Sequence, residues 1–359
     1  MIALDDVAWI GSKLREGLGG LGIHGLLLDG ILAFVAVFVV ANFALANGGL
    51  MSFVWRREMA LIQDRLGPNR VGPQGILQFM ADGIKMILKQ AMVPRRADRL
   101  IFIITPAVAA FPFVMAYLVI PFSRSGSLAD VNVGVLYLFA ITSLVFPSVF
   151  MAGWSSNNKY AMMGGMRAIA QLLAFEVPLT MSALGVVMLS GTLSTQGVVS
   201  AQHGLWFIIP QALGALIFFI AGMAENAAHP FDLPEAESEL VAGYYTEYSG
   251  IMFGLFFLAE LGTTWTLGAV FATFFLGGWQ PLIPGLEHIP VLGWPLLWFL
   301  AKSYLMFGVF TLVRFSMPRF RIDQFLGFGW KILTPLAFLN LFIAAVEVLL
   351  FGNFFKAVP

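Results

Sequence analysis

The sequence contains no cysteine and few charged residues. Without cysteine, the chain alone can hold no disulfide, iron–sulfur cluster or thiolate zinc site. Charged residues make up 11% of the chain, against about 25% in soluble domains, and hydrophobic residues reach 59%. Lys plus Arg and Asp plus Glu number 20 each, which leaves no basic excess for binding nucleic acid. The composition excludes an ordinary soluble domain and a disordered chain, and it indicates a polytopic membrane protein.

Long apolar stretches predict the fold. A helix needs about 20 mainly apolar residues to cross a membrane. Eight such stretches occur, at 26–54, 99–122, 133–153, 166–190, 206–225, 248–276, 291–316 and 329–353. We therefore expect an all-α membrane bundle of eight transmembrane helices that forms a single domain over 26–353. A membrane-surface segment at 1–25 would precede this domain, and a short tail at 354–359 would follow it.

The positions of Lys and Arg predict the orientation in the membrane. Fifteen of the 20 lie on the face that carries loop 1 (55–98), the loop at 154–165, loop 5 (226–247) and loop 7 (317–328), whereas four lie on the other face. By the positive-inside rule these loops are cytoplasmic and both termini are periplasmic. The expected location is the cell inner (plasma) membrane, or an inner-type membrane if the chain is mitochondrial or plastid. No internal repeat is visible, which disfavours a stand-alone transporter.

Loop 1 combines a rigid turn with an amphipathic pattern. Residues 67–73 read GPNRVGP and cannot form a helix. After Gly75 the pattern predicts a helix with an apolar side and a polar side, suited to the membrane interface or to covering a cavity. A basic loop that merely follows the positive-inside rule would explain the charges but not the Gly/Pro turn. The polar side carries Asp82, Lys85 and Lys89.

Loop 5 reverses the charge. From 225 to 247 the chain has six acids and no Lys or Arg. Aromatic neighbours such as Phe231 and Tyr244 would bury part of this segment, and buried carboxylates repel one another and share protons. The segment is either a solvated acidic loop or the mouth of a proton relay, and these residues leave both possibilities open. Its acids are Glu225, Asp232, Glu235, Glu237, Glu239 and Glu247.

Glu176, Glu260, Lys302 and Glu347 are ionisable residues that lie within the predicted spans or at their edges. Insertion of such a side chain at the centre of a helix costs about 2.5–3.5 kcal/mol, so each is a candidate for function. Glu176, Glu260 and Lys302 could form a polar path across the bundle, whereas Glu347 lies near the outer end and can reach the interface. The four histidines are far apart in the sequence, and no metal site is expected.

Several motifs in this order resemble one known family. They are QDRLGPNRVGP at 63–73, ADGIK at 81–85, WSSNNKY at 154–160, the segment 167–178, PFDLPE at 230–235, EYSG at 247–250 and PRFRIDQ at 318–324. Together they resemble the membrane subunit of respiratory complex I that carries the quinone entrance. In the proton-pumping NADH:quinone oxidoreductases this is the H, or first, subunit.

The resemblance implies a function that is shared with partner subunits. Quinone would be the substrate, and it would be reduced near an iron–sulfur cluster in a cluster-bearing subunit of the hydrophilic arm. FMN and the clusters would belong to partners, so this chain would hold no cofactor or catalytic residue. Small membrane subunits, antiporter-like subunits and membrane lipid would surround it.

The resemblance also implies roles for individual residues. The quinone tunnel and its interface would include Trp55, Arg56, Arg65, Asp82, Lys85, Phe231 and Asp232. The proton path would include Glu176, Glu225, Glu235, Glu237, Glu239, Glu247 and Glu260. Arg314, Arg319 and Arg321 would balance these acids.

The chain departs from the family pattern at four positions. Trp55 and Gln90 stand where the family usually has Glu, Ala228 where it has Arg, and Leu261 where it has Tyr. Trp55 and Ala228 together could delete an ion pair, which suggests an altered quinone site or altered coupling. Neutral drift compensated by partner subunits is the alternative. The same departures leave open a related anchor in a membrane-bound hydrogenase or formate hydrogenlyase complex.

Overall fold

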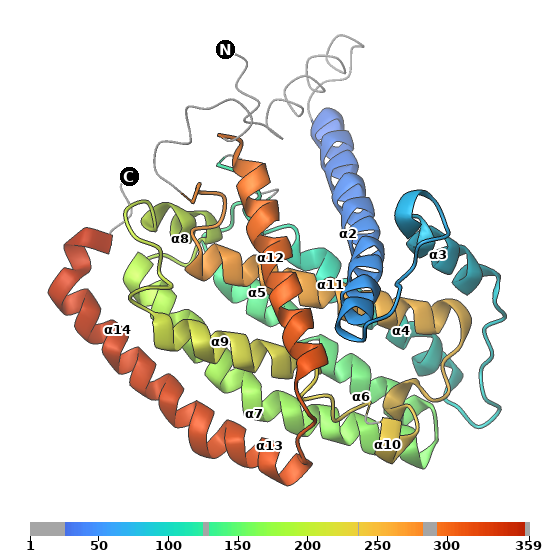
Figure 1. Cartoon of the computed structure of the whole chain (residues 1–359). Coiled ribbons are helices and arrows are strands. Elements are labelled where there is room, and N and C mark those ends of the chain that lie inside the picture. The colour runs from blue at the N-terminus through green and yellow to red at the C-terminus, as the bar shows by residue number, and fades with distance from the viewer. Residues whose placement is uncertain (1–25, 125–128, 236, 283–292, 356–359) are drawn as a thin grey trace.

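The structure, a computed structural model, describes residues 26–124, 129–235, 237–282 and 293–355 (Figure 1). Helices and short turns make up these residues, and none of them forms a strand. The all-α prediction is confirmed. The predicted N-terminal segment 1–25 and the last four residues of the predicted tail lie outside the described part.

Seven segments of the described chain are long and apolar enough to cross a membrane. A polytopic bundle is therefore confirmed. The predicted span at 206–225 corresponds to a shorter apolar helix of 14 residues, α9 (Ala212–Glu225), so the structure does not establish eight full-length spans. The seven segments are α2 (Leu26–Ile62), α4 (Arg99–Ala116), α5 with α6 (Gly134–Thr142 and Val145–Ser155), α7 (Lys159–Ser190), α11 (Gly250–Phe275), α12 (Pro295–Ser316) and the run of α13, η4 and α14 (Ile322–Phe328, Gly329–Leu333 and Thr334–Phe355).

Local sequence explains where helices begin and end. The break between α5 and α6 lies at Ser143 and Leu144. Pro147 lacks an N–H to donate to the carbonyl of Ser143, and its ring crowds that carbonyl. The side chain of Asn158 caps the start of α7 by accepting from the N–H of Tyr160. Gly191 ends α7 with a positive φ of 68°, a conformation that glycine adopts without strain.

Two predicted loop boundaries need correction. The cytoplasmic loop expected at 154–165 is mostly helical, because α6 ends at Ser155 and α7 begins at Lys159. Loop 1 begins later than expected, since α2 continues to Ile62 and includes Trp55 and Arg56. Composition marks where a segment becomes polar, but a membrane helix can continue past that point as a polar helix in water.

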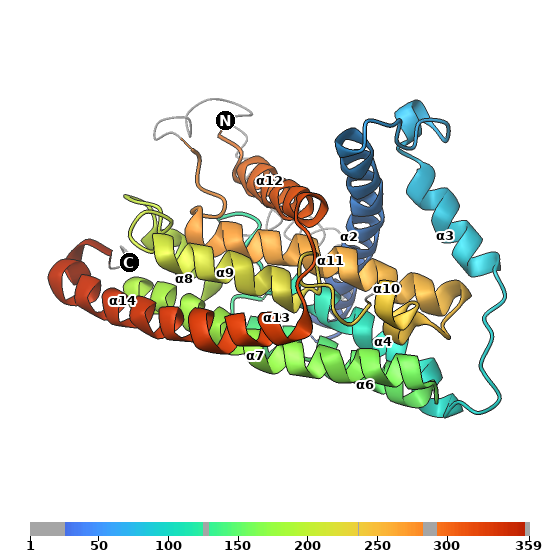
Figure 2. The same cartoon turned by 60° about the horizontal axis from the view of Figure 1, so that its bottom comes forward.

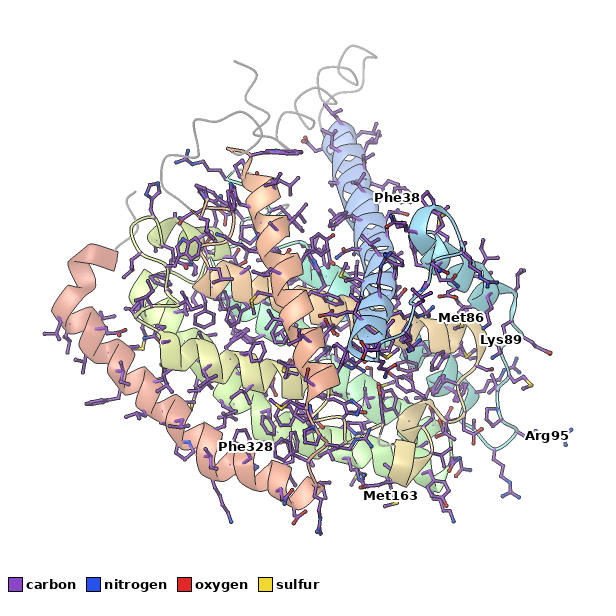
Figure 3. The ribbon with its side chains drawn as sticks, in the orientation of Figure 1. Phe38, Met86, Lys89, Arg95, Met163 and Phe328 are labelled. Carbon is purple, nitrogen blue, oxygen red and sulfur yellow. The ribbon has the colours of Figure 1, made fainter. Side chains whose placement is uncertain are left out.

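The predicted amphipathic helix of loop 1 is α3 (Gln78–Leu88), which lies at the edge of the bundle beside α2 (Figure 2). Its Phe79 ring approaches α2 closely, since a Cβ on Gly49 would lie 2.8 Å from the ring. Met86 lies against Gly254 of α11, where the corresponding distance is 3.3 Å. Figure 3 shows that Arg95, in the segment after α3, points away from the bundle. The helix is thus held on one side and leaves Met80, Ile84, Ile87 and Leu88 exposed.

The bundle is built around α7 and α11. Helix α7 packs against α6, α9 and α14, whereas α11 packs against α2, α4 and α12. Aromatic rings of α9 and α11 fill the interior, and Phe218, Phe274 and Phe275 are fully buried. Several polar residues of the interior lie near the end of the bundle where loop 5 folds back, among them Asp232 and Thr264.

Candidate functional site

Loop 5 is packed tightly onto α7. It contains α10 (Glu237–Leu240) and η2 (Gly243–Tyr245). A Cβ on Gly243, where φ is +53°, would lie 1.9 Å from the carbonyl oxygen of Pro234. A Cβ on Gly164 of α7 would lie 2.7 Å from the same oxygen. Both positions therefore require glycine, and the loop is a folded part of the bundle rather than a solvated acidic segment.

Phe231 anchors the start of loop 5. Its side chain is 5% exposed and packs among the rings of Phe175, Phe320 and Phe325. Phe320 and Phe325 come from loop 7 and α13, so loops 5 and 7 are joined at this point. The anchor places the next residue, Asp232, beneath loop 7.

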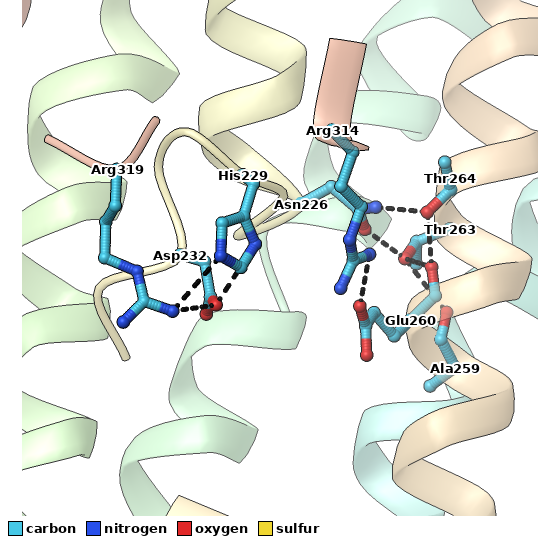
Figure 4. A network of polar contacts seen from close by, with 9 residues as sticks. All are labelled: Asn226, His229, Asp232, Ala259, Glu260, Thr263, Thr264, Arg314 and Arg319. Carbon is cyan, nitrogen blue, oxygen red and sulfur yellow. Dashed lines mark hydrogen bonds and ion pairs between the residues drawn. The ribbon is translucent and has the colours of Figure 1, made fainter. Parts of the chain in front are cut away.

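Asp232 forms a buried ion pair with Arg319 of loop 7. Nη2 of Arg319 lies 2.8 Å from Oδ2 of Asp232, and Nδ1 of His229 lies 3.3 Å from the same oxygen (Figure 4). Burial raises the pKa of Asp232 to about 6, although Arg319 and Arg314 oppose the rise. Burial and the charges of Arg319 and Arg314 lower the pKa of His229 to about 4. His229 is therefore neutral at pH 7.

A second ion pair joins Glu260 of α11 to Arg314 of α12. Nη1 of Arg314 lies 2.6 Å from Oε1 of Glu260, and both side chains are largely buried (Figure 4). The guanidinium also lies over the indole of Trp55, with its Cζ 5.4 Å from the ring centroid. A tryptophan face stabilises such a cation. Trp55 of α2 thus stabilises the cation of Arg314 without carrying a charge.

Glu235 lies beside both ion pairs. Burial raises its pKa well above the usual range, and the negative charges of Glu260 and Asp232 raise it further. A hydrogen bond from Tyr245 and the charge of Arg314 act in the opposite direction. Burial and the neighbouring carboxylates therefore favour the protonated form of Glu235. We call Asp232, Glu235, Glu260, Arg314 and Arg319 the charge cluster; with Glu235 protonated, its two carboxylates and two guanidiniums balance.

Polar side chains connect the charge cluster to Glu225. Asn226 donates to the hydroxyl of Thr264 and accepts at 2.5 Å from the hydroxyl of Thr263. Thr264 donates in turn to the backbone carbonyl of Glu260 at 2.8 Å. Figure 4 shows these contacts between the end of α9 and α11. These contacts hold Asn226 against α11, and they thereby fix the position of the preceding residue, Glu225.

Two partly open cavities meet at Glu225. Their volumes are about 60 Å³ and 50 Å³. Glu225, Asn226 and Thr263 line both cavities, and Glu235 and Glu260 line the second. A buried water needs about 10–15 Å³ of such space together with polar partners. The cavities therefore have room for a few waters between the charge cluster and Glu225.

The remaining predicted acids fall in different places. Glu176 of α7 is near enough to Glu225 for their negative charges to repel. Glu239 pairs with Arg167 at 2.5 Å, and Glu247 accepts from the side chain of Asn158 at 2.8 Å. Glu239 and Glu247 thus tie loop 5 to α7 and to the residue before it. The side chain of Glu237 lies outside the described part.

The predicted residues of loop 1 also lie in different surroundings, as does Arg321 of loop 7. Nη1 of Arg56 lies 2.5 Å from Oδ2 of Asp82, and this pair joins α2 to α3. Arg65 donates to the side chain of Gln63 at 2.7 Å, and Lys85 is exposed. In loop 7, Arg321 pairs with Asp323 at 3.4 Å in an exposed position, so it does not join the loop 5 acids.

Sequence reasoning misses two residues of the site, His229 and Glu58, and misplaces a third, Lys302. From the sequence His229 is an ordinary loop histidine, and no local pattern indicates its contact with Arg319. Glu58 of α2 accepts a hydrogen bond from the hydroxyl of Thr311 of α12, one turn from Arg314. The sequence signal that could have indicated Glu58 is its position three residues after Trp55. Lys302 does not join a path with Glu260, because its ammonium donates to the carbonyls of Leu276 and Gln280 at 2.5 and 2.6 Å.

Comparison with known proteins decides the family. The family model described as NADH dehydrogenase matches residues 34–345. The chain belongs to this family. The H subunit of an NADH-quinone oxidoreductase from Dehalococcoides mccartyi (strain CBDB1) is 46% identical over 317 residues, which cover 88% of this chain and 87% of the relative. The protein of the same name from Anoxybacillus flavithermus is 46% identical over 328 residues, or 91% and 93%. The resemblance stated from the motifs is confirmed.

Proposed function

We propose that this member of the NADH dehydrogenase family forms the wall of a quinone tunnel and the first part of a proton path, at the junction of a membrane arm with a hydrophilic arm. It would act as a membrane subunit of a proton-translocating NADH:quinone oxidoreductase. The observation that carries the proposal is the charge cluster, a buried group of three carboxyls and two guanidiniums that adjoins cavities with room for water. Coupled buried carboxyls of this kind can hold and release a proton near neutral pH.

The charge cluster can convert a change of charge into proton movement. Its proton is held because two guanidiniums cannot neutralise three carboxylates. When quinone is reduced nearby, the potential at the cluster changes and the proton is redistributed between Glu235 and Asp232. Glu225 can receive the proton through waters in the two cavities. The amide of Asn226 can position such waters but does not itself transfer protons. Glu176 would be the next acceptor, beside Glu225.

The tunnel wall would be formed by α2, α3 and the start of loop 5. The Arg56–Asp82 pair fixes α3 to α2, and exposed apolar side chains of α3 face away from the bundle. Such a surface suits the membrane interface, where a quinone with an apolar tail would approach. Trp55 and Phe231 would supply aromatic surface, and the expected roles of Arg65 and Lys85 would be at the interface.

The partners and the location are part of the proposal. Cluster-bearing subunits of the hydrophilic arm would cover loops 1 and 5 and would hold the iron–sulfur clusters, while FMN would be bound elsewhere in that arm. Small membrane subunits and antiporter-like subunits would continue the proton path. The chain would lie in the cell inner membrane, or its organellar equivalent, with both termini on the periplasmic side.

Copurification in mild detergent tests this assembly. Mass spectrometry is expected to find cluster-bearing subunits, antiporter-like subunits and an NADH-binding flavoprotein. A nickel-iron hydrogenase or formate dehydrogenase module in their place would instead support the alternative anchor function. A chain that purifies alone would contradict both assemblies.

A variant tests the proton path itself. Glu237→Gln is expected to lower coupled activity while leaving assembly intact, because Gln keeps the shape of Glu but carries no exchangeable acid proton. Activity at the wild-type rate across about pH 6–8, where coupled carboxyls titrate, would make Glu237 a structural residue.

A further inference from the structure

A second polar group lies among α7, α9 and α14, away from loop 5. The side chain of Gln211, the residue before α9, donates from Nε2 to Oε2 of Glu347 at 2.8 Å. Nδ2 of Asn340 donates to Oε1 of Gln211 at 3.0 Å. Gln211 and Asn340 are each 1% exposed. Glu347 and Asn340 are seven residues apart, which places them on one face of α14. We call Glu347, Gln211 and Asn340 the outer triad.

Glycines make room for the outer triad. A Cβ on Gly185 of α7 would lie 2.6 Å from Oε1 of Gln211, and a Cβ on Gly214 of α9 would lie 2.9 Å from Nδ2 of Asn340. Any side chain at either glycine would displace an amide. The two buried amides therefore occupy a space built between three helices, which Figures 1 and 2 show side by side.

The outer triad is distant from the charge cluster. Glu347 lies 13 residues beyond the first residue of α14, Thr334, which corresponds to about 20 Å along the helix. Loop 5 packs near the opposite end, where Phe325 of α13 meets Phe231.

Few other ionisable groups belong to the helices around the outer triad. Helix α14 carries no ionisable residue except Glu347 among its described residues. Glu176 of α7 precedes Gly185 by about 14 Å along the helix, and Glu225 of α9 follows Gly214 by about 16 Å. Lys159 and Arg167 of α7 and Lys331 of η4 lie farther toward the loop 5 end.

The chemistry of the outer triad suits two protonation states. The donor to Glu347 is a neutral amide, which stabilises a carboxylate less than a cation does. If the amides of Gln211 and Asn340 both turn over, Oε1 of Gln211 accepts from a protonated Glu347 and its Nε2 donates to Oδ1 of Asn340. The direction of the hydrogen bonds reverses, and no helix has to move.

We propose that Glu347 is a proton-binding site that loads and unloads during turnover, with Gln211 and Asn340 reversing their hydrogen bonds. The ligand is a proton, and the site lies in the outer half of the membrane domain. This inference goes beyond the proposed quinone tunnel and proton path, because it depends only on turnover of the complex and not on the charge cluster.

Infrared difference spectroscopy of the intact complex tests the proposal. Spectra of the oxidised and reduced forms are compared in the carboxyl C=O region. Glu347→Gln is expected to remove one carboxyl band, and Glu347→Asp is expected to shift it. Asn340→Leu is expected to shift the band without removing it, because the reversed hydrogen-bond chain loses its last acceptor. Asp130→Asn, which removes one carboxylate that accepts from Ser194 at 2.9 Å, is the matched control and should leave the band unchanged.

Three results would overturn the proposal. One is an identical spectrum for Glu347→Gln and the wild-type complex. Another is a band for Glu347 that does not differ between the oxidised and reduced forms. The third is a band that responds to Na⁺ at fixed pH, since the ligand would then be a metal cation. None of these results bears on copurification or on Glu237, so failure here is distinguishable from failure of the proposed function.

Discussion

Replacing Arg319 by Gln removes the cation that is paired with Asp232. In the structure, Nη2 of Arg319 lies 2.8 Å from Oδ2 of Asp232, and burial raises the pKa of Asp232 to about 6 against the influence of Arg319. Loss of an adjacent cation raises the pKa of a carboxyl by about 1–3. A rise of about 2 changes the ionised fraction of Asp232 at pH 7 from about nine tenths to about one tenth. The variant should therefore hold an extra proton at neutral pH.

The same change has a defined sign for stability. A carboxyl with a raised pKa favours folding in its protonated form, so this contribution is present at low pH and is lost as pH rises through the folded-state pKa. Each further rise of 1 corresponds to about 1.4 kcal/mol. Arg319→Gln should therefore be less stable than the wild-type protein mainly at alkaline pH, which thermal unfolding of the complex at several pH values can measure.

Quinone reductase activity in proteoliposomes, measured as a function of pH, is the functional assay. If proton transfer needs ionised Asp232, the acid limb of the profile moves to higher pH in Arg319→Gln, and activity at pH 7 falls by about tenfold while recovering at alkaline pH. Lys331→Gln, which removes an exposed cation near the start of α14, is the matched control. A uniform loss of activity with an unmoved acid limb would refute the role of Asp232 and leave Arg319 a structural residue.

Three further predictions concern loop 5, loop 1 and the departures from the family pattern. Glu235→Gln imitates the protonated acid, so assembly should persist while the ratio of protons pumped per electron falls; an unchanged ratio would contradict its place in the path. Gly75→Ala should lower the thermal stability of the complex by several degrees or prevent assembly, because φ is +83° and a Cβ would lie 2.2 Å from the carbonyl oxygen of Pro68. The double variant Trp55→Glu with Ala228→Arg should alter the KM for quinone, and unchanged KM and pumping would remove the hypothesis of an altered quinone site.

The sequence predicts those parts of the molecule that depend on local pattern. Apolar length predicts the membrane segments, and the alternation of polar and apolar residues after Gly75 predicts α3. The aromatic residues of loop 5 predict its partial burial, which Phe231 and Tyr244 confirm. These features depend on neighbours within a few turns, so one sequence is enough to read them.

The contacts of the site depend on distant parts of the chain. Asp232 and Arg319 are 87 residues apart, and nothing near either residue specifies the other. The family pattern suggests that Arg314, Arg319 and Arg321 all balance the loop 5 acids. In the structure Arg319 pairs with Asp232, whereas Arg321 pairs with Asp323 in an exposed position. Glu58 falls in the predicted polar loop, because the predicted span ends at 54. Placing it in the helix requires the structure.

These long-range contacts share one feature, which is the balance between buried positive and negative charges. Arg314 and Arg319 neutralise two carboxylates, and a third carboxyl remains that must keep a proton to stay buried. Trp55, which replaces the carboxylate usual in the family, lies against Arg314 and adds no negative charge. A glutamate at position 55 would give four carboxyls against two guanidiniums, and the cluster would then hold two protons. On the proposed proton path, Trp55 would therefore lower the number of protons that this group of residues holds. The double variant with Glu at 55 and Arg at 228 adds one charge of each sign and so leaves the net charge unchanged.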